Sequence, residues 1–131
     1  MSIYKLYGSG VTDNLASLDI AANGKIVGVA WAAYGDLDAD TETLAAEVSF
    51  SSSSGLATND TKSSISAVRA FNTSTATALI AINTFVGPGL NIPVKAGERL
   101  YLHAAGASFT GTAYVYVDDG GVAASARRTR L

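Results

Sequence analysis

Apolar and polar residues alternate in short runs along almost the whole chain, and clusters of Gly, Ser, Asn and Asp separate the runs at nearly even spacing. Such period-two alternation is typical of half-buried β-strands. In the clearest run, Glu47 and Ser49 share one face of a strand, and the opposite face is apolar: Leu44, Ala46, Val48 and Phe50. The pattern predicts nine strands, over residues 3–7, 15–20, 25–34, 44–50, 65–71, 78–85, 92–94, 99–104 and 112–118.

The strand pattern also sets the fold class. Stacking eight to nine strands as two antiparallel sheets buries their alternating faces. We therefore expect an all-β, jelly-roll-like two-sheet sandwich. Residues 1–125 are predicted to form this single domain, and residues 126–131 a basic C-terminal tail.

Two turn signals refine the expected strand order. Asn23-Gly24 lies between two apolar runs, and this dipeptide favours the positive φ angles of a tight hairpin. We therefore predict a hairpin at Asn23-Gly24. Pro93 has no amide hydrogen for a ladder, which predicts an edge position or a strand start for the short run 92–94.

The last two long strands are expected to pair, because one register aligns apolar residues throughout. It places Leu102 opposite Val115 and Leu100 opposite Val117. The reverse face would then carry an aromatic set that suits a subunit interface or a sugar-binding platform, or that simply covers the sheet: Tyr101, His103, Tyr114 and Tyr116. His103 is the single histidine, and no matched Asp, Cys or second His points to a catalytic or ligand role.

Acidic residues cluster before Leu44. With Asp36 as position one, carboxylates fall at positions 1, 3, 5, 7 and 12, close to a calcium-loop spacing: Asp36, Asp38, Asp40, Glu42 and Glu47. Thr41 replaces the turning Gly of a calcium hand, and the flanks are strands. A looser Ca²⁺ or Mg²⁺ site competes with a solvated acidic loop, so the main interpretation includes no cofactor.

Arg69 shares the expected strand face of Ile65, Ala67 and Phe71. A charge on an apolar face needs a partner, inside the subunit or at a subunit contact. The alternative is a one-residue bulge that turns Arg69 outward.

Composition narrows the functional classes. The 131 residues are 48% hydrophobic and only 15% charged, with net charge −2, so no basic field attracts nucleic acid or an anionic membrane. The chain has no cysteine and starts without an apolar signal core, which favours assembly in the cytoplasm. Three arginines in the tail could make weak, salt-sensitive contacts with phosphates or with an acidic neighbour: Arg127, Arg128 and Arg130.

Four segments together resemble small β-sandwich virion proteins of bacteriophages: Leu18–Ile20, Asn23–Trp31, Ala46–Phe50 and Val94–Leu102. These proteins include capsid decoration (cement) proteins, minor coat components and vertex or fibre-tip proteins. The resemblance implies a symmetric homo-oligomer that binds other virion or capsid subunits. It brings no catalytic residues to match.

The sequence therefore favours a non-enzymatic bacteriophage virion structural protein, located in the virion and acting through subunit contacts. The alternative is a carbohydrate- or receptor-binding module at a fibre or spike tip, with Ca²⁺ as a possible aid. An enzyme ranks third, because no nucleophile, carboxylate pair or histidine dyad has a recognisable spacing.

Overall fold

The computed structural model describes residues 1–11, 15–37, 43–51, 63–72, 76–87 and 89–120. These residues form nine strands: β1 (Ser2–Gly10), β2 (Ala16–Asp19), β3 (Gly24–Leu37), β4 (Thr43–Ser51), β5 (Ser63–Phe71), β6 (Ala78–Val86), β7 (Ile92–Val94), β8 (Arg99–Ala105) and β9 (Ser108–Asp118). All nine predicted strands are present, most of them one to four residues longer than predicted. The sequence therefore located the strands correctly.

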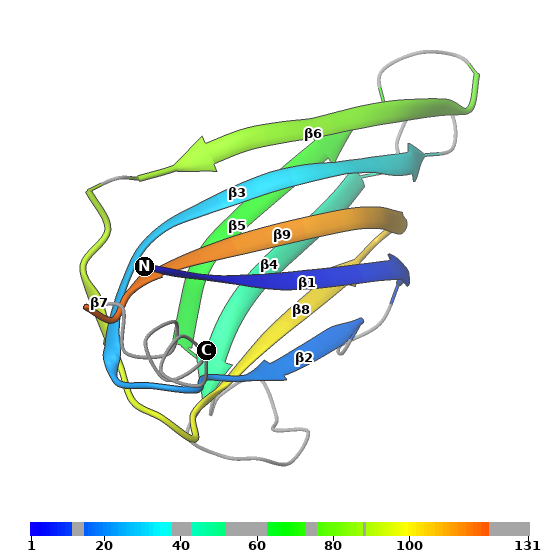
Figure 1. Ribbon diagram of the computed structural model, residues 1–131. Helices are drawn as coiled ribbons and strands as arrows, with labels where there is room; N and C mark the ends of the chain where they lie inside the picture. The colour runs from blue at the N-terminus through cyan, green and yellow to red at the C-terminus, as the bar shows by residue number, and fades with distance from the viewer. Residues whose placement is uncertain (12–14, 38–42, 52–62, 73–75, 88, 121–131) are drawn as a thin grey trace, which may run out of the picture.

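The strands form two stacked antiparallel sheets (Figure 1). Sheet A has the order β1-β9-β3-β6, with β7 beside one end of β3, and sheet B has the order β2-β8-β4-β5. Pairing is nested: β1 with β9, β2 with β8, β3 with β6 and β4 with β5. A long hairpin wrapped into two sheets produces this order, which is that of a jelly roll. The predicted fold class is confirmed.

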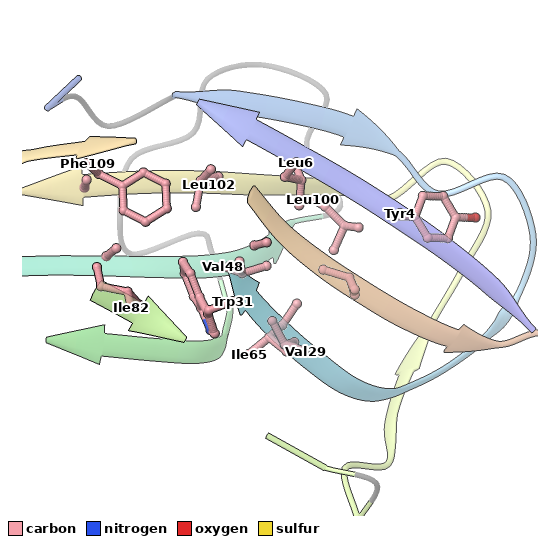
Figure 2. Close-up of a cluster of buried hydrophobic side chains, with 14 of the residues drawn as sticks. Tyr4, Leu6, Val29, Trp31, Val48, Ile65, Ile82, Leu100, Leu102 and Phe109 are labelled. Atoms are coloured by element: carbon pink, nitrogen blue, oxygen red, sulfur yellow. The ribbon is translucent and has the colours of Figure 1, made fainter. Parts of the chain in front are cut away.

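The core lies between the sheets and takes alternating residues from strands of both sheets (Figure 2). Trp31 of sheet A is 3% exposed and meets Phe109 edge to face, with ring centroids 6.0 Å apart. Its Nε1 donates a hydrogen bond of 2.9 Å to Ser66 Oγ on sheet B. The indole therefore packs in the core and also ties the two sheets together.

The predicted pairing of the last two strands is wrong. β8 belongs to sheet B and β9 to sheet A, so Leu102 faces Val115 across the core and does not lie beside it in a ladder. The expectation that Leu100, Leu102, Val115 and Val117 are buried together is confirmed, since all four are 0% exposed. The alternation of apolar and polar residues predicts which side chains are buried. It does not distinguish a strand in the same sheet from one in the opposite sheet.

The predicted hairpin at Asn23-Gly24 is also wrong, because β2 and β3 belong to different sheets. Asn23 Oδ1 instead accepts a 2.9 Å hydrogen bond from the amide of Ala96. Gly24 is needed for close packing: a Cβ there would lie 2.7 Å from the carbonyl oxygen of Asp118. Both residues therefore lie in the connection that takes the chain from β2 in sheet B to β3 in sheet A.

Two smaller expectations are resolved by β5 and β7. The ladder between β4 and β5 shifts at Ile65, where Val48 faces Ser66 and the next residue faces Ser64. This bulge leaves Ile65 and Ser66 buried and Arg69 exposed, so the outward alternative for Arg69 is confirmed. Pro93 lies in β7, whose described partner is β3, and the predicted edge position is confirmed.

Candidate functional site

The outer face of sheet A carries most of the large exposed apolar side chains among the described strands. It consists of the positions that alternate with the core, and its large side chains come from all four main strands: Ile3, Tyr7, Tyr34, Leu79, Phe85, Tyr114 and Tyr116. We call this set the aromatic face. Cross-strand pairing aligns its members, with Ile3 opposite Tyr116 and Ala30 between Tyr114 and Phe85.

Five members of the aromatic face are well exposed. Their exposed fractions are 58% for Ile3, 60% for Tyr7, 42% for Tyr34, 67% for Leu79 and 52% for Phe85. Single exposed apolar residues are normal on soluble proteins, but five large ones on the same face of one sheet favour an interaction surface.

Few charges interrupt the aromatic face. Among the described residues, Lys5 lies within it, Lys25 and Asp118 lie at one end, and Asp36 lies at the other end. A partner that covers the centre therefore has one ammonium group to desolvate. Depletion of charge at the centre, with charges at the rim, is the usual composition of a protein interface.

One aromatic pair is fixed before any partner binds. Phe85 and Tyr116 meet edge to face, with centroids 5.9 Å apart. Gly28 lies beneath the Phe85 ring, and a Cβ at this position would approach Phe85 Cζ to 2.9 Å. The glycine lets the ring lie against the sheet, so this part of the aromatic face is pre-organised.

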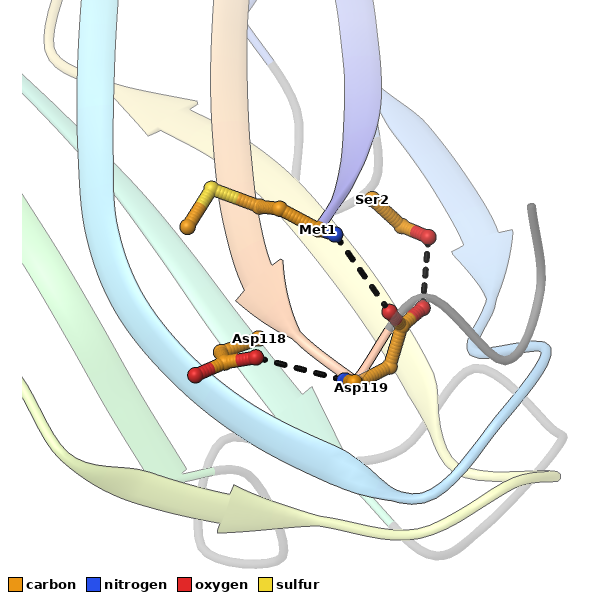
Figure 3. Close-up of polar contacts among 5 residues, drawn as sticks. Met1, Ser2, Asp118 and Asp119 are labelled. Carbon is orange, nitrogen blue, oxygen red and sulfur yellow. Dashed lines mark hydrogen bonds and ion pairs between the residues drawn. The ribbon is translucent and has the colours of Figure 1, made fainter. Parts of the chain in front are cut away.

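The N-terminal end of β1 is held by a buried carboxylate (Figure 3). Asp119 accepts a 2.5 Å hydrogen bond from Ser2 Oγ, and its other oxygen lies 3.8 Å from the Met1 amino nitrogen. Asp118 Oδ1 accepts a hydrogen bond from the amide of Gly120. These contacts fix the end of β1 against the end of β9 and thus hold one margin of the aromatic face.

The outer face of sheet B is ionic. Arg99 Nε donates to Asp19 Oδ1 at 2.8 Å. The Arg99 guanidinium lowers the pKa of Asp19 through this hydrogen bond, and Asp19 raises the pKa of Arg99 in return. Glu47 and His103 form a second cross-strand pair, with 2.5 Å between Oε1 and Nε2.

The contacts of His103 bear on whether this pair could act in catalysis. Within the described part of the chain, the hydrogen-bond partner of His103 is Glu47, and no nucleophilic side chain there is bonded to the imidazole. A carboxylate that orients a histidine is one element of nucleophilic catalysis, which also requires a nucleophile within hydrogen-bond reach. The pair stabilises the join between β4 and β8.

The predicted joint aromatic face is wrong in its composition. Tyr101 and His103 lie on sheet B, whereas Tyr114 and Tyr116 lie on sheet A, because β8 and β9 are not neighbours. Tyr101 is 1% exposed and therefore offers no free surface. The Tyr114 and Tyr116 rings are half-buried within the aromatic face.

Five exposed members of the aromatic face were not expected from the sequence: Ile3, Tyr7, Tyr34, Leu79 and Phe85. A signal was available, because the runs 3–7 and 78–86 are apolar at both odd and even positions. A strand that is apolar on both faces is either buried on both sides or presents an apolar face to a partner.

The acidic candidates are not gathered by the described fold. Asp36 lies on the outer face of sheet A and Glu47 on the outer face of sheet B, so the sandwich separates them. Asp38, Asp40 and Glu42 lie outside the described residues, as do Arg127, Arg128 and Arg130 of the tail. Within the described residues, no group of three His, Cys, Asp or Glu side chains could hold a metal ion. No helix in this part of the chain is long and apolar enough to cross a membrane.

No protein-family model and no curated protein matches this sequence. Among solved structures, the chain is similar to Eiger TNF from S. frugiperda, with a TM-score of 0.51 and 10% identity over 89% of this chain and 86% of that one. It also aligns with infectious bursal disease virus, Gt strain (TM-score 0.47, 16% identity), and with the VP2 subviral particle of that virus (TM-score 0.42, 13% identity). Each alignment covers 92% of this chain but 33% of the virus chain, so this chain spans about a third of their length. The Eiger TNF likeness shows the sandwich fold.

Proposed function

We propose that this protein is a non-enzymatic structural subunit of a virus particle and that it acts through subunit contacts made by the aromatic face. The observation that carries the proposal is the exposure of Ile3, Tyr7, Tyr34, Leu79 and Phe85 on one sheet with few charges among them. Burying aromatic anchors of this kind contributes about 2 kcal/mol each at the centre of an interface.

Three further observations support a structural role. The jelly roll is an architecture of viral capsid and lectin domains, which is analogy of fold alone. The low content of charged residues fits a chain with much surface covered by neighbours. The His103–Glu47 pair has no catalytic partner among the described contacts. The finer proposal, from the sequence resemblance, is a bacteriophage decoration or coat component assembled in the host cytoplasm.

A carbohydrate- or receptor-binding module is the second candidate, and the exposed rings of Tyr7, Tyr34 and Phe85 are the observation that favours it. Sugar recognition by a sandwich combines exposed rings with nearby polar groups that hydrogen-bond hydroxyls. Trp31, the strongest ring for such a platform, is buried and bonded to Ser66. The aromatic face therefore fits a protein partner better.

The test compares two double variants that add the same charge to different faces. Tyr7→Glu with Tyr34→Glu alters the aromatic face, and Ser17→Glu with Ala67→Glu alters exposed positions of sheet B. Light scattering over a range of protein concentrations measures assembly. Mass spectrometry of gradient-purified virus particles, from cultures that produce the protein, measures its incorporation into the particles.

We expect the first variant to lose assembly and incorporation, and the second to keep both, while thermal unfolding shows that both are folded. Equal behaviour of the two variants, or absence of the wild-type protein from particles, would overturn the proposal. Binding of the wild type to a glycan array, abolished by the Tyr7 and Tyr34 changes, would favour the second candidate instead.

A further inference from the structure

Among the described residues the sandwich has five edge strands, β1, β6 and β7 in sheet A and β2 and β5 in sheet B, and they differ in how they are protected against pairing with another chain. An exposed strand edge presents unpaired amide and carbonyl groups, and proteins usually protect it with charge, proline, a bulge or shortness. In sheet B, β2 has only four residues and β5 carries Arg69 and the bulge at Ile65. In sheet A, β1 carries Lys5 on its outer face, and β7 has three residues and contains Pro93.

The remaining edge, β6, has none of these features. Its nine residues, ALIAINTFV, include no charged residue, proline or glycine, and its register with β3 runs without a shift from Val29–Val86 to Leu37–Ala78. Within the described part of the chain, β3 is the strand to which β6 pairs. Figure 1 shows β6 at the margin of its sheet. Among the described residues, this edge is therefore long and regular, and its own nine residues carry none of the usual protective features.

The sequence of β6 is self-complementary when two copies run antiparallel about Ile82. Residues equally distant from Ile82 then face each other and share a face of the sheet. On the outer face, Leu79 meets Phe85 of the second copy, and these are the two most exposed apolar side chains of the strand, at 67% and 52%. On the inner face, Ile82 meets its own copy, and Ala78 meets Val86.

We propose that β6 pairs with β6 of a second copy of this chain about a two-fold axis, which joins two A sheets into one continuous sheet. A two-fold contact uses the same patch on both copies, which is what a self-complementary strand provides. A nine-residue antiparallel ladder supplies about ten backbone hydrogen bonds, as many as a typical protein interface contains. The inference rests on the proposed function for its setting, because it names the partner in one of the subunit contacts.

The pairing also extends the aromatic face. Leu79 and Phe85 lie on that face, so the joined sheet presents two aromatic faces side by side on one surface. Arg69 is the charged side chain, among the described residues, that lines the cleft beside the middle of β6 together with Val68 and Ile82. Two copies bring two Arg69 side chains near the axis, one on each side of it and both on the same face of the joined sheet. We therefore expect added salt to leave the dimer unchanged or slightly tighter.

The test places charges at Ala81 and Asn83, which are exposed on β6 and would face each other across the axis. One variant carries Ala81→Lys with Asn83→Lys, and the other carries Ala81→Glu with Asn83→Glu. The matched control carries Ser17→Lys with Ala67→Lys, which adds the same charge to the outer face of sheet B. Sedimentation equilibrium of the full chain gives the dimer dissociation constant, and circular dichroism melting verifies the fold.

We expect a wild-type dimer, and dissociation constants roughly 100-fold higher for the Lys and Glu variants, because like charges then lie directly opposite each other. An equimolar mixture of the two variants should form a heterodimer at least as tight as the wild type. The control should dimerise like the wild type. Hydrogen exchange should show β6 amides protected in the wild type and in the mixture, but not in either variant alone.

The pairing is overturned if the wild type is monomeric, if the Lys and Glu variants dimerise as tightly as the wild type, or if their mixture stays monomeric. These outcomes are separate from failure of the proposed function. A dimer that behaves as expected but never enters virus particles refutes the virion role and leaves the β6 pairing intact. Conversely, the protein could enter particles in a way that depends on Tyr7 and Tyr34 without forming a dimer. That result refutes the β6 pairing and leaves the virion role intact.

Discussion

The outer faces of sheets A and B alternate with the same core, yet they differ in chemistry. Sheet A presents Tyr7, Tyr34 and Phe85 with few charges, whereas sheet B presents the Asp19–Arg99 and Glu47–His103 pairs. Phe71 at the end of β5 is the large exposed apolar side chain on the described part of the B face. An ionic face is stable in water, while an apolar face gains free energy when it is covered. The difference favours sheet A as the side that a partner would cover.

The edges of the two sheets repeat this contrast. β2 and β5 of sheet B are short, or bulged and charged, whereas β6 of sheet A is long and uncharged. Both the face and one edge of sheet A therefore favour contacts with other chains, whereas the two edges of sheet B are protected. The features that favour contacts with other chains, the aromatic face and the β6 edge, thus both belong to sheet A.

The largest expected effect removes the core that both sheets share. Val115 is 0% exposed on the inner side of β9, and Val115→Asp would bury a carboxylate without a partner. We expect a loss of about 4 kcal/mol or more in the free energy of unfolding, enough to prevent folding of a typical domain. Circular dichroism and solubility measure the result. A soluble Val115→Asp protein with a cooperative melt would contradict the packing of sheet A on sheet B.

A smaller effect is expected from the bond that crosses between the sheets. Trp31→Phe removes the Nε1 donor and leaves Ser66 Oγ buried without its partner, at a cost of about 1–3 kcal/mol. Urea unfolding measures the loss. The double variant with Ser66→Ala should lose less than the sum of the two single changes, because each single change leaves one polar group unpaired. Strict additivity would show that the hydrogen bond does not couple the sheets.

The smallest effect is expected on the ionic face. Asp19 and Arg99 are exposed, so Asp19→Asn should lower stability only slightly at neutral pH. Arg99 lowers the pKa of Asp19 in the folded state, so the stabilisation is present above the ordinary value of 3.8 and is lost as pH falls through the lowered pKa. The difference between wild type and variant should therefore vanish in acid. A thermal-denaturation series from neutral to acidic pH measures it, and a difference that grows toward low pH would refute this account.

Local patterns in the sequence were sufficient to locate the strands and the core. Alternation over four to nine residues reports which side of a strand is buried, and this explains why Leu100, Leu102, Val115 and Val117 were correctly expected in the core. The bulge at Ile65 was one of two alternatives for Arg69, because alternation alone does not locate an inserted residue. The roles of the tail arginines and of the acidic residues stay predictions.

The aromatic face could be predicted only in part. Tyr114 and Tyr116 were expected to point outward, and they do lie on the outer face of sheet A. Tyr101 was assigned to the same face because β8 and β9 were expected to be neighbours, and it is buried on sheet B instead. Tyr7, Tyr34 and Phe85 come from three other strands, so their proximity depends on the strand order.

The sequence by itself determined the number of strands, their inward faces and the all-β class, because these depend on residues close together in the chain. Only the tertiary structure decided which strands are neighbours. The nested pairing places Ser2 opposite Val117, two residues far apart in the chain. Pairing of such distant strands competes with hairpins between strands that are neighbours in the chain, because both would use the same strand edges. Asn23-Gly24 has the composition of a tight turn and yet forms a crossing, since Gly24 must pack against the end of β9. Surfaces assembled from several strands, such as the aromatic face, exist only once that order is fixed.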